Sequence, residues 1–218
     1  MVVVSEPLWL AATNCYAVAL ERGGTCVLVD APPDLDGITR LLAKQDLTPT
    51  ALLVTHGHVD HTGGSGAVVR ATGATAYVHP DDDWMTLDPV TQLRMLFGGT
   101  PPEAGDFEPP QRFEALADGQ QLSLAGFSLE VRHTPGHTPG HCCFYLPSEG
   151  LLFSGDQLFA GSIGRTDLPG GDHAQLMQSM EAKVLTLPDD TDVLPGHGPR
   201  TTLADERRTN PFLAELSL

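Results

Sequence analysis

The sequence predicts a mixed α/β fold, and two patterns indicate this. Short runs of β-branched and apolar residues recur along the chain, and segments with helical apolar spacing lie between them. The chain has 218 residues, of which 41% are hydrophobic, so it has the size and apolar share of one globular domain. We therefore expect residues 1–218 to form a single domain of strands and helices.

Ten segments have the length and β-branched or aromatic content of strands, and most are bounded by turn-forming residues. In chain order, the expected strands are 2–4, 16–20, 26–29, 51–55, 76–79, 122–124, 127–131, 142–146, 151–154 and 192–194. The pair Gly23-Gly24 falls between the second and third of these, where it predicts a hairpin turn. The run Pro32-Pro33 ends the third strand.

Five segments have apolar residues at helical spacing. The expected helices are 35–45, 66–72, 89–97, 173–187 and 203–213. In the fourth, the stripe Leu176, Met180, Val184 and Leu187 predicts a face that is turned to the core. Residues 98–110 are rich in Pro, Gly and acidic residues, which predicts a loop.

The charge balance excludes several classes of partner. There are 12 Lys and Arg against 28 Asp and Glu, which gives a formal charge of −16. This charge repels phosphate backbones and anionic lipid surfaces, so we expect neither a nucleic-acid partner nor a membrane partner. The start of the chain lacks the basic segment and cleavage site of a secretory signal, and we expect a cytoplasmic protein.

The four cysteines lack the C-x-x-C spacing of a redox or zinc motif, and we expect buried thiols. Cys142 and Cys143 are adjacent in an expected strand, so their side chains should point to opposite faces of a sheet.

A dense group of metal-ligand residues follows the expected strand 51–55. His56, His58, Asp60 and His61 lie within six positions, and glycines beside them let the chain turn tightly. Imidazole and carboxylate are ligands for Zn²⁺ and other divalent ions. A single histidine on a loop is usually an ordinary polar residue, but three histidines and an aspartate together after a buried strand predict a metal site.

Three further candidate ligands lie at strand ends beside glycine. They are His137 in Pro-Gly-His-Thr, Asp156 in Ser-Gly-Asp, and His197 in Pro-Gly-His-Gly. Loops at the ends of neighbouring strands converge in space, so these side chains can join the first group. Seven candidate ligands exceed the number that one tetrahedral ion requires.

This ordered set of residues resembles the metallo-β-lactamase superfamily, from Asn14 to Phe212. Residues 155–167 are similar to the glyoxalase II-like branch, which contains the hydroxyacylglutathione hydrolases. The resemblance implies a four-layer αβ/βα sandwich of two mixed sheets flanked by helices. It also implies the division of the seven ligands, with His56, His58 and His137 on one ion, Asp60, His61 and His197 on a second, and Asp156 bridging both. Zinc is the expected metal, with iron and manganese as alternatives.

The same resemblance implies a substrate-binding role for Arg165, because glyoxalase II enzymes carry a basic residue there that faces the thiol conjugate. The alternative is a local ion pair between Arg165 and Asp167. Asp167 departs from the aromatic residue of typical glyoxalase II enzymes. Only 21 residues follow His197, where those enzymes have a helical extension that grips glutathione. We therefore expect a short form that binds glutathione poorly.

The chemistry of such a site is hydrolysis. Two ions about 3.5–4 Å apart can lower the pKa of a shared water and polarise a carbonyl, while Asp60 orients the water and accepts a proton. The leading hypothesis is a hydrolase of a small-molecule thioester, such as an S-2-hydroxyacylglutathione or a related acyl-thiol. The sequence leaves the physiological thiol, the native metal and the oligomeric state open.

Three alternatives remain. A mononuclear Fe(II) persulfide dioxygenase would use His56, His137 and Asp156, but such relatives usually have His-Asp-Tyr at the last ligand, where this chain has His-Gly-Pro. A lactonase or other ester or amide hydrolase would share the metal chemistry. A non-catalytic binding domain stabilised by metal would be favoured by a lost ligand, and none is lost.

The four remaining histidines are weaker candidates. His133 and His141 flank an expected loop and either support the metal ligands or are ordinary polar residues at strand ends. His79 and His173 are expected to be solvated or to cap helices.

Overall fold

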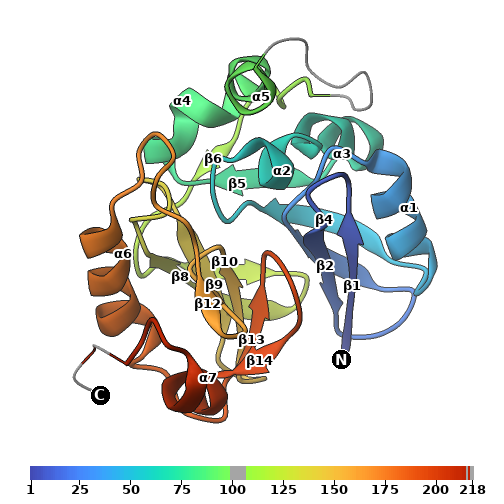
Figure 1. Cartoon of the computed structure of the whole chain (residues 1–218). Helices are drawn as coiled ribbons and strands as arrows, with labels where there is room; N and C mark the ends of the chain where they lie inside the picture. The colour runs from blue at the N-terminus through green and yellow to red at the C-terminus, as the bar shows by residue number, and fades with distance from the viewer. Residues whose placement is uncertain (99–106, 215, 217–218) are drawn as a thin grey trace.

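The computed structural model describes residues 1–98, 107–214 and 216. Two six-stranded sheets face each other, and helices cover their outer sides (Figure 1). Most of the loop expected at 98–110 lies outside the described residues. Among the helices that the structure describes, none is long and apolar enough to cross a membrane.

The first sheet has the order β1-β2-β3-β4-β5-β6. Its strands are β1 (Val2–Leu8), β2 (Thr13–Ala19), β3 (Thr25–Val29), β4 (Thr48–Leu53), β5 (Thr75–Val78) and β6 (Glu114–Ala115). β1, β2 and β3 are antiparallel neighbours, and the turn at Gly23-Gly24 joins β2 to β3 as expected. From β3 to β6 the pairing is parallel. The helices α1 (Leu35–Ala43) and α3 (Ser65–Thr72) form the crossovers between β3, β4 and β5.

The second sheet has the order β14-β13-β10-β9-β8-β7. Its strands are β7 (Gln121–Leu124), β8 (Phe127–His133), β9 (Cys142–Leu146), β10 (Leu151–Gly155), β13 (Asp192–Pro195) and β14 (Thr201–Thr202). Only β10 and β13 are parallel among its described pairs, and α6 (His173–Ser179) lies on the crossover between them. A short hairpin of β11 (Leu158–Phe159) and β12 (Ser162–Ile163) precedes that helix.

Three separate hydrophobic clusters define the four layers. One lies between the sheets and joins Val27 of β3 to Phe144 of β9. The second lies under α1 and joins Leu28 to Ile38, because successive residues of a strand face opposite sides. The third lies under α6 and α7 (Leu203–Thr209), which Figure 1 shows on the outer side of the second sheet. The four-layer αβ/βα sandwich with two mixed sheets is therefore confirmed.

Three helices end earlier than the sequence predicts, and the first of them ends at Ala43 instead of residue 45. The α-helix that begins at His173 ends at Ser179 and continues as one π-helical segment over Met180–Val184, although its apolar stripe is buried as expected. The last helix ends at Thr209 and not at residue 213, because Asn210 has an extended backbone before Pro211. A residue that precedes proline is sterically restricted to that conformation.

All four cysteines are buried free thiols. Cys142 faces the core between the sheets, whereas Cys143 faces the core under α6, so the expected opposite orientation is confirmed. Burial raises the pKa of the Cys143 thiol to about 12, which makes it unreactive at neutral pH.

The motif loops leave the two sheets at neighbouring strand ends. Residues 54–58 follow β4 and lead into α2 (Val59–Thr62), while residues 134–141 join β8 to β9. The remaining two motifs follow β10 and β13, which are paired in parallel and therefore end at the same edge. Above this edge lie a 3₁₀ turn (Pro80–Asp82), α4 (Asp83–Thr86) and α5 (Pro89–Phe97) (Figure 1).

Candidate metal centre

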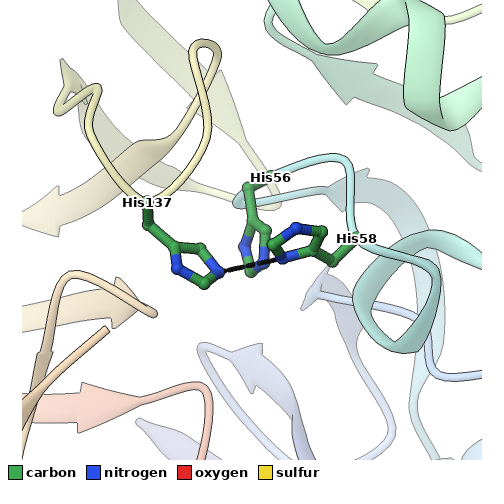
Figure 2. A group of neighbouring side chains, drawn as sticks. All are labelled: His56, His58 and His137. Carbon is green, nitrogen blue, oxygen red and sulfur yellow. Dashed lines mark hydrogen bonds between the residues drawn. The ribbon is translucent and has the colours of Figure 1, made fainter. Parts of the chain in front are cut away.

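Three imidazoles from two loops converge on one point. His58 Nδ1 lies 3.1 Å from His56 Nε2 and 2.9 Å from His137 Nε2, and the two Nε2 atoms are 3.2 Å apart (Figure 2). Metal–nitrogen bonds of about 2.0–2.1 Å in a tetrahedron separate the nitrogens by roughly 3.3 Å. The spacing of the three nitrogens is therefore that of a metal site.

A second set of donors lies beside the first. His61 Nε2 is 3.3 Å from His197 Nε2, and each of these nitrogens is 3.3 Å from Asp60 Oδ2. Asp156 lies between the two sets, with Oδ1 3.4 Å from His61 Nε2 and Oδ2 3.5 Å from His137 Nε2. All seven side chains that the sequence singles out as candidate ligands thus meet in one cluster.

The Asp156 carboxylate shows that the cluster fits cations. Its Oδ1 atom is fully buried and has no hydrogen-bond partner within the described part of the chain. A buried carboxylate oxygen without a partner costs several kcal/mol, which a bound cation would offset. A side chain at Gly196 would collide with this carboxylate, which explains the glycine before the last histidine. The donor set therefore suits two neighbouring divalent ions.

Hydrogen bonds assign the tautomers of the inward-facing imidazoles. His137 Nδ1 donates to the Arg165 carbonyl at 2.7 Å, and His61 Nδ1 donates to Asp30 Oδ2 at 2.7 Å. In the neutral imidazole, each bond leaves the lone pair of Nε2 pointing into the cluster, as metal binding requires.

Asp30 is a supporting residue of the site that the local sequence pattern does not reveal. It directly follows β3 with φ 60°, and its carboxylate is buried. It accepts hydrogen bonds from the Thr55 backbone N–H at 2.7 Å and from Thr55 Oγ1 at 2.9 Å, in addition to the bond from His61. Since the Thr55 hydroxyl donates to Asp30, it accepts from His56 Nδ1 at 3.0 Å. Asp30 therefore orients imidazoles from both donor sets.

A second buried carboxylate, Asp82, joins the two loops that carry His56, His58 and His137. It accepts hydrogen bonds from the Gly57 N–H, the Gly140 N–H and Thr138 Oγ1, each at 2.7 Å. Burial raises the pKa of Asp82 despite these bonds. The sequence offers only three consecutive aspartates at this place, a pattern that is usually a solvated surface run.

We expect Asp82→Ala to lower the free energy of unfolding of the metal-free protein by about 2–4 kcal/mol. The substitution leaves two backbone N–H groups and one hydroxyl buried without an acceptor. Urea unfolding in the presence of a chelator measures this loss. Asp81→Ala is the matched control, since its side chain is exposed, and an equal loss in both variants would contradict the cross-linking role.

The other histidines separate into one supporting residue and three that do not contact the cluster. His141 Nε2 accepts from the Asp156 backbone N–H at 3.0 Å, and its ring lies beside that of His56. His133 contacts the Pro139 carbonyl and stacks on His79, whose Nδ1 caps the 3₁₀ turn. These two rings are nearly parallel, so their nitrogen lone pairs do not converge on one ion. His173 is exposed at the start of α6.

β2 supplies three polar side chains that hold the site from below. Thr13 Oγ1 donates to Asp60 Oδ2 at 2.8 Å. Asn14 Nδ2 donates to the carbonyls of Pro195 and Gly198, and the Tyr16 hydroxyl also donates to the Pro195 carbonyl. The loop that carries the last histidine is thereby anchored to the first sheet.

The two donor sets differ in charge. Burial and neighbouring imidazoles lower the pKa of His58 to about 3 and that of His56 well below its usual value. Burial also lowers the pKa of His137, to about 4. For His61 the effect of burial is outweighed by surrounding carboxylates, which raise its pKa well above the usual value. A hydrogen bond to Asp60 raises the pKa of His197 against the effect of burial.

This difference predicts a pH-dependent loss of metal in two steps. His56, His58 and His137 have pKa values lowered below the usual value, so protons compete little with an ion there at pH 7, whereas the raised pKa values of His61 and His197 let protons compete with an ion at a higher pH. As the pH falls from about 8 to about 5, we expect the ion of the His61 set to leave first. Elemental analysis after dialysis at each pH measures this. In His197→Ala the pH-sensitive ion should be missing throughout, and loss of both ions at a single pH would contradict the prediction.

The cluster lies at the floor of an open cavity of 440 Å³. Trp9, Leu10 and Ala11, from the turn between β1 and β2, form one wall, and Leu168 and Arg165 lie on another side. The Arg165 guanidinium forms a two-pronged ion pair with Asp167, with both N–O distances 2.7 Å, and the side chain is 59% exposed. The alternative of a local Arg165–Asp167 ion pair is therefore present, at the rim of the cavity.

Two mixed sheets with a buried His/Asp cluster at their common edge define an αβ/βα sandwich of the metal-binding class. The profile of the Metallo-beta-lactamase superfamily matches residues 9–197, and the chain belongs to this superfamily.

Similar proteins include hydrolases and metal-bound structures. Hydroxyacylglutathione hydrolase GloC of Haemophilus influenzae is 36% identical over 207 residues, which span 95% of each chain. The crystal structure of the BLEG-1 B3 metallo-beta-lactamase matches with a TM-score of 0.88 at 36% identity, over 98% of this chain and 100% of that chain. TTHA1623, solved in a di-iron-bound form, matches with a TM-score of 0.84 at 39% identity, over 98% and 100% of the two chains.

Proposed function

We propose that this protein hydrolyses small-molecule thioesters with two divalent metal ions. The observation that carries the proposal is the convergence of seven donors in two sets that share Asp156. His56, His58 and His137 would hold one ion, Asp60, His61 and His197 the other, and Asp156 both. When bound, such a pair of ions supplies Lewis-acid polarisation and lowers the pKa of a shared water. The similarity to GloC supports thioesters as the substrate class.

The side chains around the cavity favour water as the nucleophile. Neither serine nor cysteine is among the described residues that line it. Asp60 faces the cavity, and nearby imidazoles lower its pKa well below the usual value, so its carboxylate stays ionised. Thr13 holds Asp60 Oδ2 in place, which lets this carboxylate orient a water molecule by accepting a hydrogen bond from it. The apolar turn with Trp9 and Leu10 shields one side of the substrate.

We further propose zinc as the resident metal and the cytoplasm as the compartment. Imidazole and carboxylate are ligands for zinc, although they also accept iron, which TTHA1623 binds. The four free thiols suit a reducing compartment.

Parallel assays on one preparation test the function. We expect close to two divalent ions per chain, chelator-sensitive hydrolysis of thioesters, and no oxygen uptake with a glutathione persulfide. A single tightly bound iron together with persulfide-dependent oxygen consumption would instead identify a dioxygenase. Lactone or β-lactam hydrolysis that exceeds thioester hydrolysis would retain the metal chemistry but overturn the substrate class.

We expect S-lactoylglutathione to be hydrolysed with a high KM. Arg165 is the only cationic side chain on the described lining of the cavity other than histidine, and Asp167 already pairs with it. Both carboxylates of glutathione therefore lack a free charged partner, and each missing contact forfeits about 1.5–3 kcal/mol. Steady-state kinetics on matched thioesters measure this. A micromolar KM that Arg165→Ala abolishes would indicate a dedicated glutathione thioesterase.

A further inference from the structure

A small apolar groove opens beside the metal cluster. We call it the acyl groove and define it by Trp84 and Met85 of α4, Met95 of α5, and the loop residues Leu168 and Pro169. His58 and Gln92 complete its lining, and its volume is 150 Å³. His58 and Leu168 also line the main cavity, so the groove adjoins the place where a substrate would meet the metal cluster.

Gln92 attaches the groove rigidly to the metal-binding loop. Its Nε2 donates to the carbonyls of Gly57 and Met85, at 2.8 and 2.9 Å, and its Oε1 accepts from the Val59 N–H at 3.1 Å. All hydrogen-bonding groups of this buried amide are thus directed away from a ligand. The glutamine therefore fixes α5 against the loop of His56 and His58 and adds no polar contact to the groove.

The walls of the groove are apolar and accessible. Trp84 is 51% exposed and Met95 is 65% exposed, so both of these wall residues can be reached from solvent. No Asp, Glu, Lys or Arg is among the described residues that line the groove. Such a surface gains free energy by binding an uncharged hydrocarbon group and offers nothing to a charged one.

We propose that the acyl groove binds the apolar acyl chain of the thioester, while the thiol portion occupies the main cavity. This inference rests on the proposed thioester hydrolysis and names its substrate class: medium-length, apolar acyl groups. The volumes decide which end of the thioester lies in which cavity, because an apolar cavity of about 150 Å³ holds a group as large as benzene. A peptide-like thiol exceeds that volume, which leaves the open cavity of 440 Å³ for it.

A chain-length series on one small, uncharged thiol tests the assignment. With N-acetylcysteamine thioesters from acetyl to octanoyl, we expect kcat/KM to rise about threefold per methylene up to roughly hexanoyl and then to level off. The hexanoyl-to-acetyl ratio should be on the order of 100-fold. Met95→Asp places a charge in the groove and should reduce this ratio at least about tenfold.

Leu87→Asp is the matched control, because Leu87 is a similarly exposed residue at the end of α4 that does not line the groove. It should keep the wild-type ratio, and the ratio is independent of how much enzyme is folded. A binding measurement avoids the metal altogether. In chelator-treated Trp9→Phe protein, Trp84 is the remaining indole, and hexanamide should change its fluorescence more than acetamide does.

The outcomes separate the two proposals. If no thioester is hydrolysed, the proposed function fails. If thioesters are hydrolysed but kcat/KM does not rise from acetyl to hexanoyl, the assignment of the acyl groove is wrong while the proposed function stands. The same conclusion follows if the hexanoyl-to-acetyl ratio is equal in Met95→Asp and wild type. A preference that follows the apolar length of the thiol instead of the acyl chain also overturns the assignment.

Discussion

Asp156→Asn is expected to lower kcat/KM for thioester hydrolysis by at least about 1,000-fold, well beyond the 10- to 100-fold that follows loss of a supporting hydrogen bond at a metal site. The reason is the position of the carboxylate between the two donor sets, with one oxygen near His61 and the other near His137. An amide keeps the shape but has no negative charge to offer two cations. Its NH₂ group would also face imidazole lone pairs or a cation.

Two measurements on the variant distinguish loss of metal from loss of fold. Elemental analysis should show fewer than two ions per chain, and near-ultraviolet circular dichroism should be unchanged. Asp190→Asn is the matched control, since this aspartate is exposed, is not one of the seven donors and should retain both ions. If Asp156→Asn retains two ions and wild-type activity, the shared-ligand arrangement is wrong.

Asp30→Asn is expected to lower activity by about 10- to 100-fold, although Asp30 does not line the cavity. An Asn amide in contact with His61 Nδ1 would turn this nitrogen into an acceptor and move the proton to Nε2. The lone pair that faces the cluster would then be lost. Asn adopts a positive φ readily, so the backbone at this position is not strained by the change.

The metal content of Asp30→Asn distinguishes this mechanism from general damage. We expect the affinity for the ion of the Asp60, His61 and His197 set to fall by about 10- to 100-fold. The affinity for the other ion should fall less, because Thr55 relays the effect to His56. Saturation with metal should restore part of the activity. If the affinities for both ions fell equally and a high metal concentration restored no activity, Asp30 would only stabilise the fold.

Local patterns were sufficient to predict the element types and the ligand cluster. Strand and helix periodicity identified the ten main strands and the larger helices, because burial of one face leaves a repeating apolar pattern. The residues of the HxHxDH segment identify themselves by their chemistry and close spacing. His137, Asp156 and His197 could be added because each follows a strand and lies beside glycine.

The contacts that support the metal-binding loops and that occupy Arg165 depend on the tertiary structure. Asp30 and Asp82 look like ordinary loop aspartates in the sequence, yet the fold buries both against donors that are far away along the chain. Whether Arg165 pairs with Asp167 or is free to bind a substrate depends on the geometry of its loop, which cannot be read from residue types.

The sequence by itself thus determined the layered α/β class and the donors of the metal centre. Both depend on patterns among neighbouring residues and on polar residues that directly follow strands. The tertiary structure decided the tautomer of His61, the link between two loops through Asp82, and the apolar groove beside His58. Each of these brings together residues that are at least 25 positions apart in sequence, such as Gly57 and Asp82. Burial and hydrogen-bond satisfaction act on groups that meet only after the chain has folded.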